Sequence, residues 1–121
     1  MWKFFLVALL AFVSVSLSAQ TKITPDEAVK HIGDSVTVCG KIFGGRYFDR
    51  GENKITLLNM GAAYPQSPLT IVIEADSRKN FNNKPEEFYA NKEVCVTGVV
   101  KEYKGKPQII IAKEAEIVVK P

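Results

Sequence analysis

Two segments of the sequence combine cationic side chains with aromatic rings, the pairing that a site for single-stranded nucleic acid needs. The segments "GGRYFDRGENK" and "EYKGK" supply the predicted ligand-binding residues Arg46, Tyr47, Phe48, Arg50, Lys54, Tyr103, Lys104 and Lys106. Cations follow the phosphates of a strand while rings stack on its bases, and each stack contributes roughly 1–3 kcal/mol. Both segments together therefore predict a surface that binds nucleotides.

The same segments also allow a purely structural interpretation. Lys104, Gly105 and Lys106 have the composition of a solvated hairpin turn, and Tyr103 and Phe48 would then close the ends of a barrel. The acidic residues in these segments are Asp49, Glu52 and Glu102. Their negative charge opposes a strong site for a polyanion.

The two cysteines, Cys39 and Cys95, occupy the outward phase of two segments that alternate like β-strands. If these strands are antiparallel neighbours, pairing the cysteines in register also sets Val38 opposite Val96 and keeps the apolar faces inward. An even pair of cysteines in an exported protein is more often bridged than free. We therefore predict a disulfide, with free thiols as the alternative, and no metal site, because a structural zinc site needs more Cys and His than this chain has.

The motifs of the common hydrolases do not occur in the sequence. It has neither Gly-x-Ser-x-Gly nor His-Glu-x-x-His, and His31 is its one histidine. Glu74 and Asp76 stand two residues apart at the end of a predicted strand, where they would offer two carboxylates to a divalent cation. A solvated strand end is the favoured interpretation of these two carboxylates, so we expect no enzymatic activity and no cofactor.

The first nineteen residues have the pattern of a secretory signal peptide. Lys3 precedes an unbroken apolar run from Phe4 to Val13, and small residues follow near a cut at about position 19. The apolar run is shorter than the roughly 20 residues that a membrane-spanning helix needs. We predict a signal peptide at 1–19 and an exported mature chain, periplasmic or secreted and not inserted in the membrane; an uncleaved N-terminal anchor is the alternative.

The mature chain, 20–121, contains 102 of the 121 residues, which is the usual size of one domain. Without Lys3, fifteen Lys and Arg remain against thirteen Asp and Glu, a net charge of +2. Proteins that wrap duplex DNA are far more basic. The charge therefore permits a nucleic-acid ligand without requiring one.

A short helix is predicted at "TPDEAVKHIG", directly after the signal peptide. Thr24 and Glu27 have the spacing of a capping box, and Gly33 ends the segment. At helical spacing, Ala28, Val29 and Ile32 would form the apolar face of this helix.

After Asp34 the apolar pattern changes to a period of two, which is typical of β-strands. The predicted strands are 35–43, 53–60, 69–75, 92–103 and 107–113, followed by an extension at 115–120. A single helical turn at 85–89 separates the third strand from the fourth, and Gly40 and Gly98 mark bends in the first and fourth. The residues expected in the core are Val36, Val38, Ile42, Val94, Val96 and Val100.

This order of elements predicts an all-β protein, a five-stranded OB-fold Greek-key barrel with a short N-terminal helix and a short helix between strands three and four. The segments "VTVCGKI", "LLNMGAAYPQSPLTIVI" and "FYANKEVCVTGVVKEYKGKPQI" resemble small exported bacterial OB-fold proteins described as nucleic-acid-binding-like. The resemblance covers nearly the whole mature chain. It implies the OB-fold and a nucleic-acid ligand, and, since related domains are also fused to secreted nucleases, an exported nuclease or envelope protein as a partner.

The sequence thus predicts an exported, non-enzymatic binding module, with single-stranded nucleic acid or oligonucleotides as the leading ligand. An OB-fold binds its ligand across strands two and three, between the loops that join strands one to two and four to five. These loops are the two cationic and aromatic segments. The alternative is a periplasmic or cell-surface interaction domain that binds a protein, a saccharide or a small ligand through the same face.

Overall fold

The computed structural model describes residues 21–121, and the predicted signal peptide lies outside them. The strands are β1 (Lys22–Ile23), β2 (Ser35–Tyr47), β3 (Thr56–Met60), β4 (Leu69–Ile73), β5 (Glu93–Tyr103), β6 (Lys106–Ile111) and β7 (Ile117–Val119). The helices are the 3₁₀-helices η1 (Pro25–His31) and η2 (Glu114–Glu116) and the α-helices α1 (Ala75–Arg78) and α2 (Pro85–Phe88). None of the helices in this part of the chain is long and apolar enough to cross a membrane.

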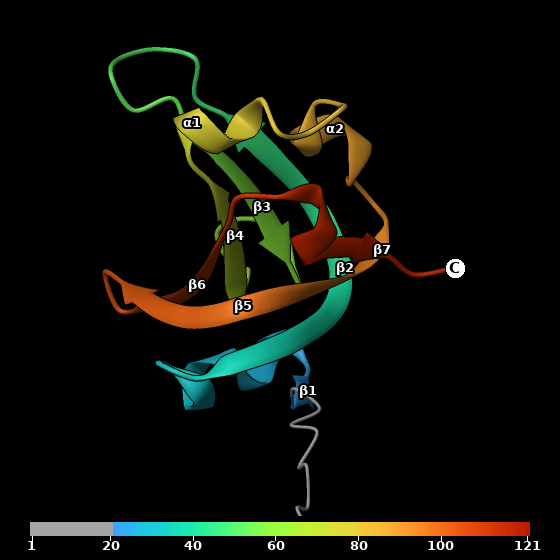
Figure 1. Cartoon of the computed structure of the whole chain (residues 1–121). Coiled ribbons are helices and arrows are strands. Elements are labelled where there is room, and N and C mark those ends of the chain that lie inside the picture. Colours follow the sequence, from blue (N-terminus) through green and yellow to red (C-terminus); the bar gives the residue numbers. More distant parts are fainter. Residues whose placement is uncertain (1–20) are drawn as a thin grey trace, which may run out of the picture.

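Five of the strands close into a barrel (Figure 1). β2 pairs with β3 and β3 with β4, both antiparallel, and β4 pairs with β6 in parallel. β6 pairs with β5, and β5 returns to β2, which completes the circle. β1 and β7 extend the sheet beside β2 and β5. This is the strand order of the OB-fold, so the predicted fold class is confirmed.

The two mid-strand glycines lie where β2 and β5 turn a corner of the barrel. β2 pairs with β5 up to Lys41 and with β3 from Ile42 onward, two residues after Gly40. β5 changes its partner from β2 to β6 two residues after Gly98. A Cβ atom would lie 2.6 Å from Pro25 at Gly40 and 2.7 Å from Ile109 at Gly98. Glycine therefore allows the close packing at both corners.

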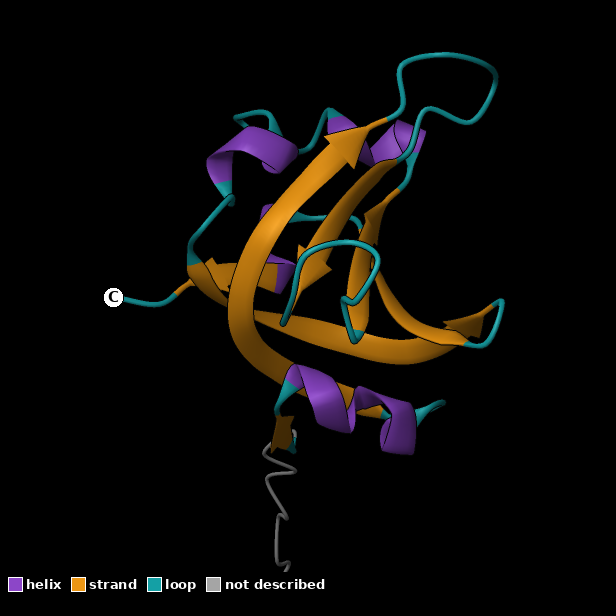
Figure 2. Cartoon of the chain, turned by 180° about the vertical axis from the view of Figure 1, so that it is seen from behind, coloured by secondary structure: helices purple, strands orange, loops and turns teal. Residues whose placement is uncertain are grey.

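Alternate residues of the barrel strands fill the core. Val36, Val38, Ile42, Val94, Val96 and Val100 are all buried, as predicted, together with Leu58, Met60, Leu69, Ile71, Ile73, Ile109 and Ile111. η1 packs on one end of the barrel, and the connector that carries α1 and α2 lies at the other end (Figure 2). The core is therefore closed at both ends by the short helices.

The expected apolar face of the N-terminal helix is wrong in part. Val29 and Ile32 are 58% and 39% exposed, whereas Pro25 and Ala28 are buried. The reason is the helix type: η1 is a 3₁₀-helix, whose side chains repeat every three residues rather than every 3.6. The capping pair is present, because the backbone N–H and the hydroxyl of Thr24 both donate to the Glu27 carboxylate at 2.9 Å.

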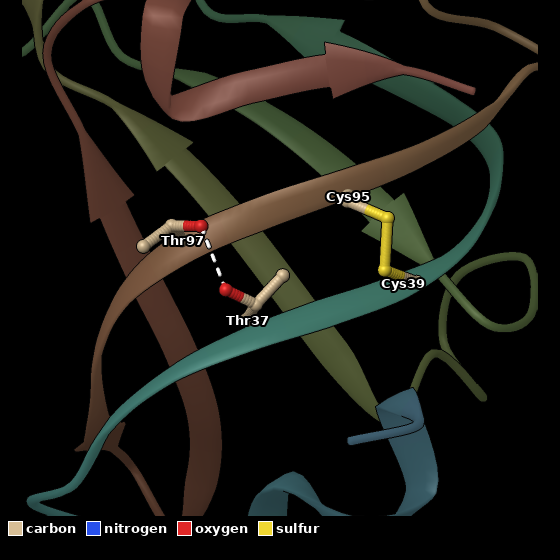
Figure 3. Close-up of a disulfide and its surroundings, with 4 residues drawn as sticks. All are labelled: Thr37, Cys39, Cys95 and Thr97. Atoms are coloured by element: carbon tan, nitrogen blue, oxygen red, sulfur yellow. Dashed lines mark hydrogen bonds between the residues drawn. A yellow bond between two sulfur atoms is a disulfide. The ribbon is translucent and has the colours of Figure 1, made fainter. Parts of the chain in front are cut away.

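The predicted disulfide joins Cys39 and Cys95, with 4.0 Å between their Cα atoms (Figure 3). The two cysteines are direct partners in the β2–β5 ladder, one position away from the pair Val38 and Val96, which is the predicted register. Two positions along the same ladder, the hydroxyl groups of Thr37 and Thr97 are hydrogen-bonded at 2.9 Å. The bridge therefore lies outside the barrel, on the seam that closes it.

Shortening a core side chain tests the inward phase of β5. We expect Val96→Ala to lower the free energy of unfolding by about 1–3 kcal/mol, because it removes buried methyl groups and leaves a cavity. Val99→Ala in the same strand is the matched control, since Val99 is 43% exposed. Denaturant unfolding of both variants measures the difference, and equal midpoints would contradict the assigned phase.

Candidate binding groove on the barrel

A hollow of about 510 Å³ lies on the outer face of β3, β4 and β6. Its lining residues are Ile55, Leu57, Tyr64, Thr70, Val72, Glu74, Tyr103, Lys104, Lys106, Pro107, Gln108 and Ile110. Its volume is within the range of roughly 300–1,000 Å³ that small-ligand sites occupy. This hollow, here called the groove, covers the face on which OB-folds bind their ligands.

The floor of the groove consists of two transverse rows of side chains. Leu57 is opposite Val72, and Val72 is opposite Ile110, so these three form an apolar row across β3, β4 and β6. Thr70 and Gln108 are partners in the neighbouring row, which is polar. A ligand in the groove would meet an aliphatic strip beside a strip of hydrogen-bonding groups.

The turn between β5 and β6 forms one rim of the groove. Lys104 and Gly105 have φ values of 50° and 79°, the positive values that a two-residue type I′ hairpin requires at both positions. Tyr103 and Lys106 are the last pair of the ladder, and Tyr103 is 58% exposed. The Lys104 ammonium lies 5.4 Å from the centre of the Tyr103 ring. The turn is thus an ordinary hairpin that also presents an open ring and two cations.

A second exposed tyrosine comes from the loop between β3 and β4. Tyr64 lines the groove and is 78% exposed. This loop touches the opposite turn, because the Lys106 ammonium donates to the carbonyl of Pro65 at 3.4 Å. Two tyrosines from separate loops therefore border one end of the groove, where each could stack on a planar ligand group.

The acidic residue of the second segment does not face the groove. Glu102 is exposed but is not one of the residues that line the groove, whereas its neighbour Tyr103 lines it and pairs with Lys106. Successive side chains of a strand point to opposite faces. Glu102 therefore repels a polyanion in the groove less than the sequence suggested.

The residues of the first segment are placed differently from the sequence prediction. Arg46 and Tyr47 belong to the end of β2 rather than to the following loop. Arg46 is opposite Leu57, so its side chain lies beside the apolar row of the groove, one strand further along. Its guanidinium lies 4.8 Å from the centre of the Phe48 ring. A second hollow of about 410 Å³ is lined by Arg46, Tyr47, Phe48, Asp49 and Arg50. Lys54 is exposed and lines neither hollow.

Tyr47 is covered by a cation of the chain itself. The Arg78 guanidinium lies 3.7 Å from the centre of the Tyr47 ring and donates to both oxygens of the Glu86 carboxylate, at 2.8 and 3.0 Å. It also donates to the hydroxyl of Thr56, which is buried, at 2.7 Å. Arg78 therefore ties α1 and α2 to the ends of β2 and β3, and one face of the Tyr47 ring is not free to stack on a ligand.

The contact between Arg78 and Glu86 shifts both ionisation equilibria. The hydrogen bonds from Arg78 hold the pKa of the Glu86 carboxyl below its ordinary value of 4.5, and those to Glu86 raise the pKa of Arg78. The side chains are only 18% and 15% exposed. Since the folded-state pKa of Glu86 is depressed, the ion pair stabilises the fold above a pH of about 4.5, and this stabilisation is lost as the pH falls through the folded-state pKa.

This ion pair predicts a pH-dependent effect of substitution. We expect Glu86→Gln to lower the free energy of unfolding by about 2 kcal/mol at neutral pH, because it leaves the largely buried Arg78 guanidinium without its charged partner. The difference from the parent protein should shrink as the pH falls below about 4.5 and through the lowered folded-state pKa of Glu86, where the parent also loses the carboxylate. Denaturant unfolding across this range measures it, with the exposed neighbour Glu87→Gln as the control. A constant difference would contradict the prediction.

No protein-family model and no curated protein sequence matches this chain. Among solved structures, it is similar to a putative aspartyl-tRNA synthetase from Leishmania major Friedlin, with 13% sequence identity and a TM-score of 0.49. The match covers 88% of this chain and 22% of that one, so this chain spans less than a quarter of its length. A likeness this distant says nothing about what the chain binds.

Sequence reasoning missed the apolar floor of the groove and Tyr64. Leu57, Val72 and Ile110 fall in the outward phase of their strands, where a half-exposed strand normally has polar residues. The available signal was the uninterrupted apolar runs "LL", "IVI" and "III". Such a run indicates a strand with apolar side chains on both of its faces, the outer one included.

Proposed function

We propose that this chain is an exported, non-enzymatic OB-fold module that binds single-stranded nucleic acid in the groove. Bases would lie on the rings of Tyr64 and Tyr103, and phosphates would lie near Lys104 and Lys106. Stacking and cationic contacts are the two interactions by which proteins hold single strands without requiring a particular sequence.

The observation that carries this proposal is the combination of side chains at one end of the groove. Two strongly exposed tyrosines from separate loops and the two lysines of the β5–β6 turn line one hollow on the ligand face of an OB barrel. Thr70 and Gln108 add a hydroxyl and an amide to the floor, and both groups can donate to and accept from the edge of a base. Arg46, one strand further along the apolar row, offers a further cation to the phosphates.

Export is part of the same proposal. The leader-like pattern at 1–19 and the bridge between Cys39 and Cys95 both suit an oxidising compartment, the periplasm or the medium. The resemblance to small exported OB-fold proteins supports the same location, and with it an exported nuclease or an envelope protein as a partner.

One observation favours a second candidate ligand. Leu57, Val72 and Ile110 form an aliphatic floor, and aliphatic surface suits an apolar side chain of a protein or peptide as well as it suits a base. The second candidate is therefore a periplasmic or cell-surface domain that binds a protein segment, a saccharide or a small ligand through the groove.

A titration with an oligonucleotide at several salt concentrations distinguishes the two. For a single strand, the logarithm of the binding constant should fall against the logarithm of the salt concentration with a slope of about 0.7 per contacted phosphate. We expect a slope that corresponds to two or more phosphates for the mature chain with oligothymidylate. No binding, or binding that is insensitive to salt, would contradict the nucleic-acid proposal, and cleavage of the oligonucleotide during the titration would contradict a non-enzymatic role.

A further inference from the structure

A bulge in β2 places an aromatic ring on the outer face of the barrel. Ile42 is opposite Met60 and Gly45 is opposite Leu58, so β2 has one residue more than β3 between these two pairs. A bulge of this kind re-aims the side chains beside it. Ile42 is buried, whereas the next residue, Phe43, is 42% exposed. Phe43 therefore points outward, although it lies between inward positions of the strand.

Phe43 stands at the end of a row of side chains that begins in the groove. Gln108 is opposite Thr70, and Thr70 is opposite Asn59. Asn59 is the β3 residue between the two pairs that flank the bulge, so it faces Phe43 and the residue after it. The polar row of the groove therefore continues across β3 to the aromatic ring on β2.

Two cations of β2 accompany this ring. The Lys41 ammonium lies 5.1 Å from the centre of the Phe43 ring. Glu93 is the ladder partner of Lys41, but within residues 21–121 the two form no ion pair. Arg46 is exposed and lies opposite Leu57 on the outer face. β2 therefore repeats, on the far side of the sheet, the combination of an exposed ring and two cations that the β5–β6 turn presents.

From these two matching ends, we infer that a single strand crosses the outer face of the barrel from the β5–β6 turn to the bulge of β2, where Phe43 stacks on a base. The inference rests on the proposed function and extends its site beyond the groove to Phe43 and Lys41. Thr70 and Gln108 lie under the middle of the strand, where they can bond the edges of bases. Arg46 is the cation for the phosphates at the far end.

The path avoids the carboxylate that lines the groove. Thr70 marks the row on β4, and Glu74 is four residues further along the chain. At about 3.3 Å per residue, this places Glu74 about 13 Å from the row. The Debye length at physiological ionic strength is about 8 Å. Glu74 therefore repels a strand on this path only weakly.

The width of the sheet sets the length of strand that reaches both ends. From β5, which carries Tyr103, the order runs over β6, β4 and β3 to β2, which carries Phe43. These four interstrand steps of about 4.8 Å add up to about 19 Å. Stacked nucleotides are about 3.4 Å apart, so about six nucleotides reach from one ring to the other. A strand of three nucleotides can occupy only one end.

The experiment removes the ring of Phe43 and varies the length of the strand. We expect Phe43→Ala to weaken the binding of a nine-nucleotide oligothymidylate about tenfold, because one stacked base is lost. Binding of a three-nucleotide oligothymidylate, which remains between Tyr64 and Tyr103, should be unchanged. Phe43→Tyr keeps a ring and should bind both strands as the parent does. Val118→Ala is the matched control, because Val118 is 57% exposed on β7, outside the path.

A fluorescent reporter tests the same contact without removing the ring. Trp2, the one tryptophan of the sequence, lies in the predicted signal peptide, so Phe43→Trp gives the mature chain a single tryptophan. We expect the nine-nucleotide strand to quench its emission through stacking, and to leave the emission of Val118→Trp unchanged.

Three results would overturn the inference and leave the proposed function standing. They are full binding of the nine-nucleotide strand by Phe43→Ala, an unquenched tryptophan at position 43 in a variant that still binds, and an equal loss of affinity for both strand lengths. The last result would mean that Phe43 does not hold a separate end of the strand. If the parent protein binds neither strand, both the inference and the proposed function are overturned.

Discussion

Replacing both bridged cysteines by alanine is expected to lower the free energy of unfolding by about 4 kcal/mol. This is the chain-entropy cost of opening the loop closed by the bridge, and the sequence separation between Cys39 and Cys95 is 56 residues. Since single domains are stable by only about 5–15 kcal/mol, the loss would bring the protein close to unfolding at physiological temperature. Denaturant unfolding of the double variant measures it, and adding reductant to the parent protein should produce a similar shift.

The control for this variant is the threonine pair on the same two strands. Thr37→Ala together with Thr97→Ala removes one cross-strand hydrogen bond at 2.9 Å, and we expect a loss of about 1 kcal/mol. The comparison separates the covalent bridge from the general loss of a cross-strand pair. If the cysteine variant loses no more than the threonine variant, the seam between β2 and β5 is held by its ladder and the bridge contributes little.

The barrel could be predicted from the sequence because its determinants are local or pairwise. Alternation placed Val36, Val38, Val94 and Val96 inward, and the matching phase of the cysteines fixed the register of β2 against β5. The extent of β2 could not be predicted in the same way. Its pairing continues past a bulge between Ile42 and Gly45 that the alternation does not reveal.

The groove was only partly predictable for a related reason. Tyr103, Lys104 and Lys106 are adjacent in sequence and remained together in the structure, because a two-residue turn holds them. The place of Tyr64 in the groove depends on which loops meet across β4 and β6, and a parallel pair has no hairpin that would indicate it locally. The contact between the Arg78 guanidinium and the Tyr47 ring likewise forms only because the connector that carries Arg78 folds over the end of the barrel.

The position of Arg78 also bears on how the groove keeps its shape. Through Glu86 it holds α1 and α2 together, and through Thr56 it holds them to the start of β3, two residues before Leu58 of the core. Ile55, which lines the groove, directly precedes this anchor. The rim of the groove at Ile55 is thus tied by hydrogen bonds to the connector that carries α1 and α2.

Removing the ring and both cations of the β5–β6 turn is expected to weaken oligonucleotide binding about a hundredfold. The variant combines Tyr103→Ala, Lys104→Asn and Lys106→Gln, which together remove one stacking ring and two phosphate contacts. Asn is chosen at Lys104 because φ is 50° there, and Asn followed by Gly105 is the preferred sequence of a type I′ turn. The melting temperature should therefore hardly change. The slope of the salt dependence should fall by about 1.4, which is about 0.7 for each of the two lost contacts.

The matched control removes the same charge from strands outside the groove, with Lys22→Gln and Lys120→Gln. Lys22 belongs to β1 and Lys120 follows β7, and these strands border β2 and β5 rather than β3, β4 and β6. If this control weakened binding as much as the groove variant, the ligand would respond to net charge alone. If the groove variant melted much earlier, Tyr103 would be a structural plug of the barrel end. Full binding at full stability would remove the nucleic-acid site from this face, because the cationic end of the groove would then contribute nothing to holding a strand.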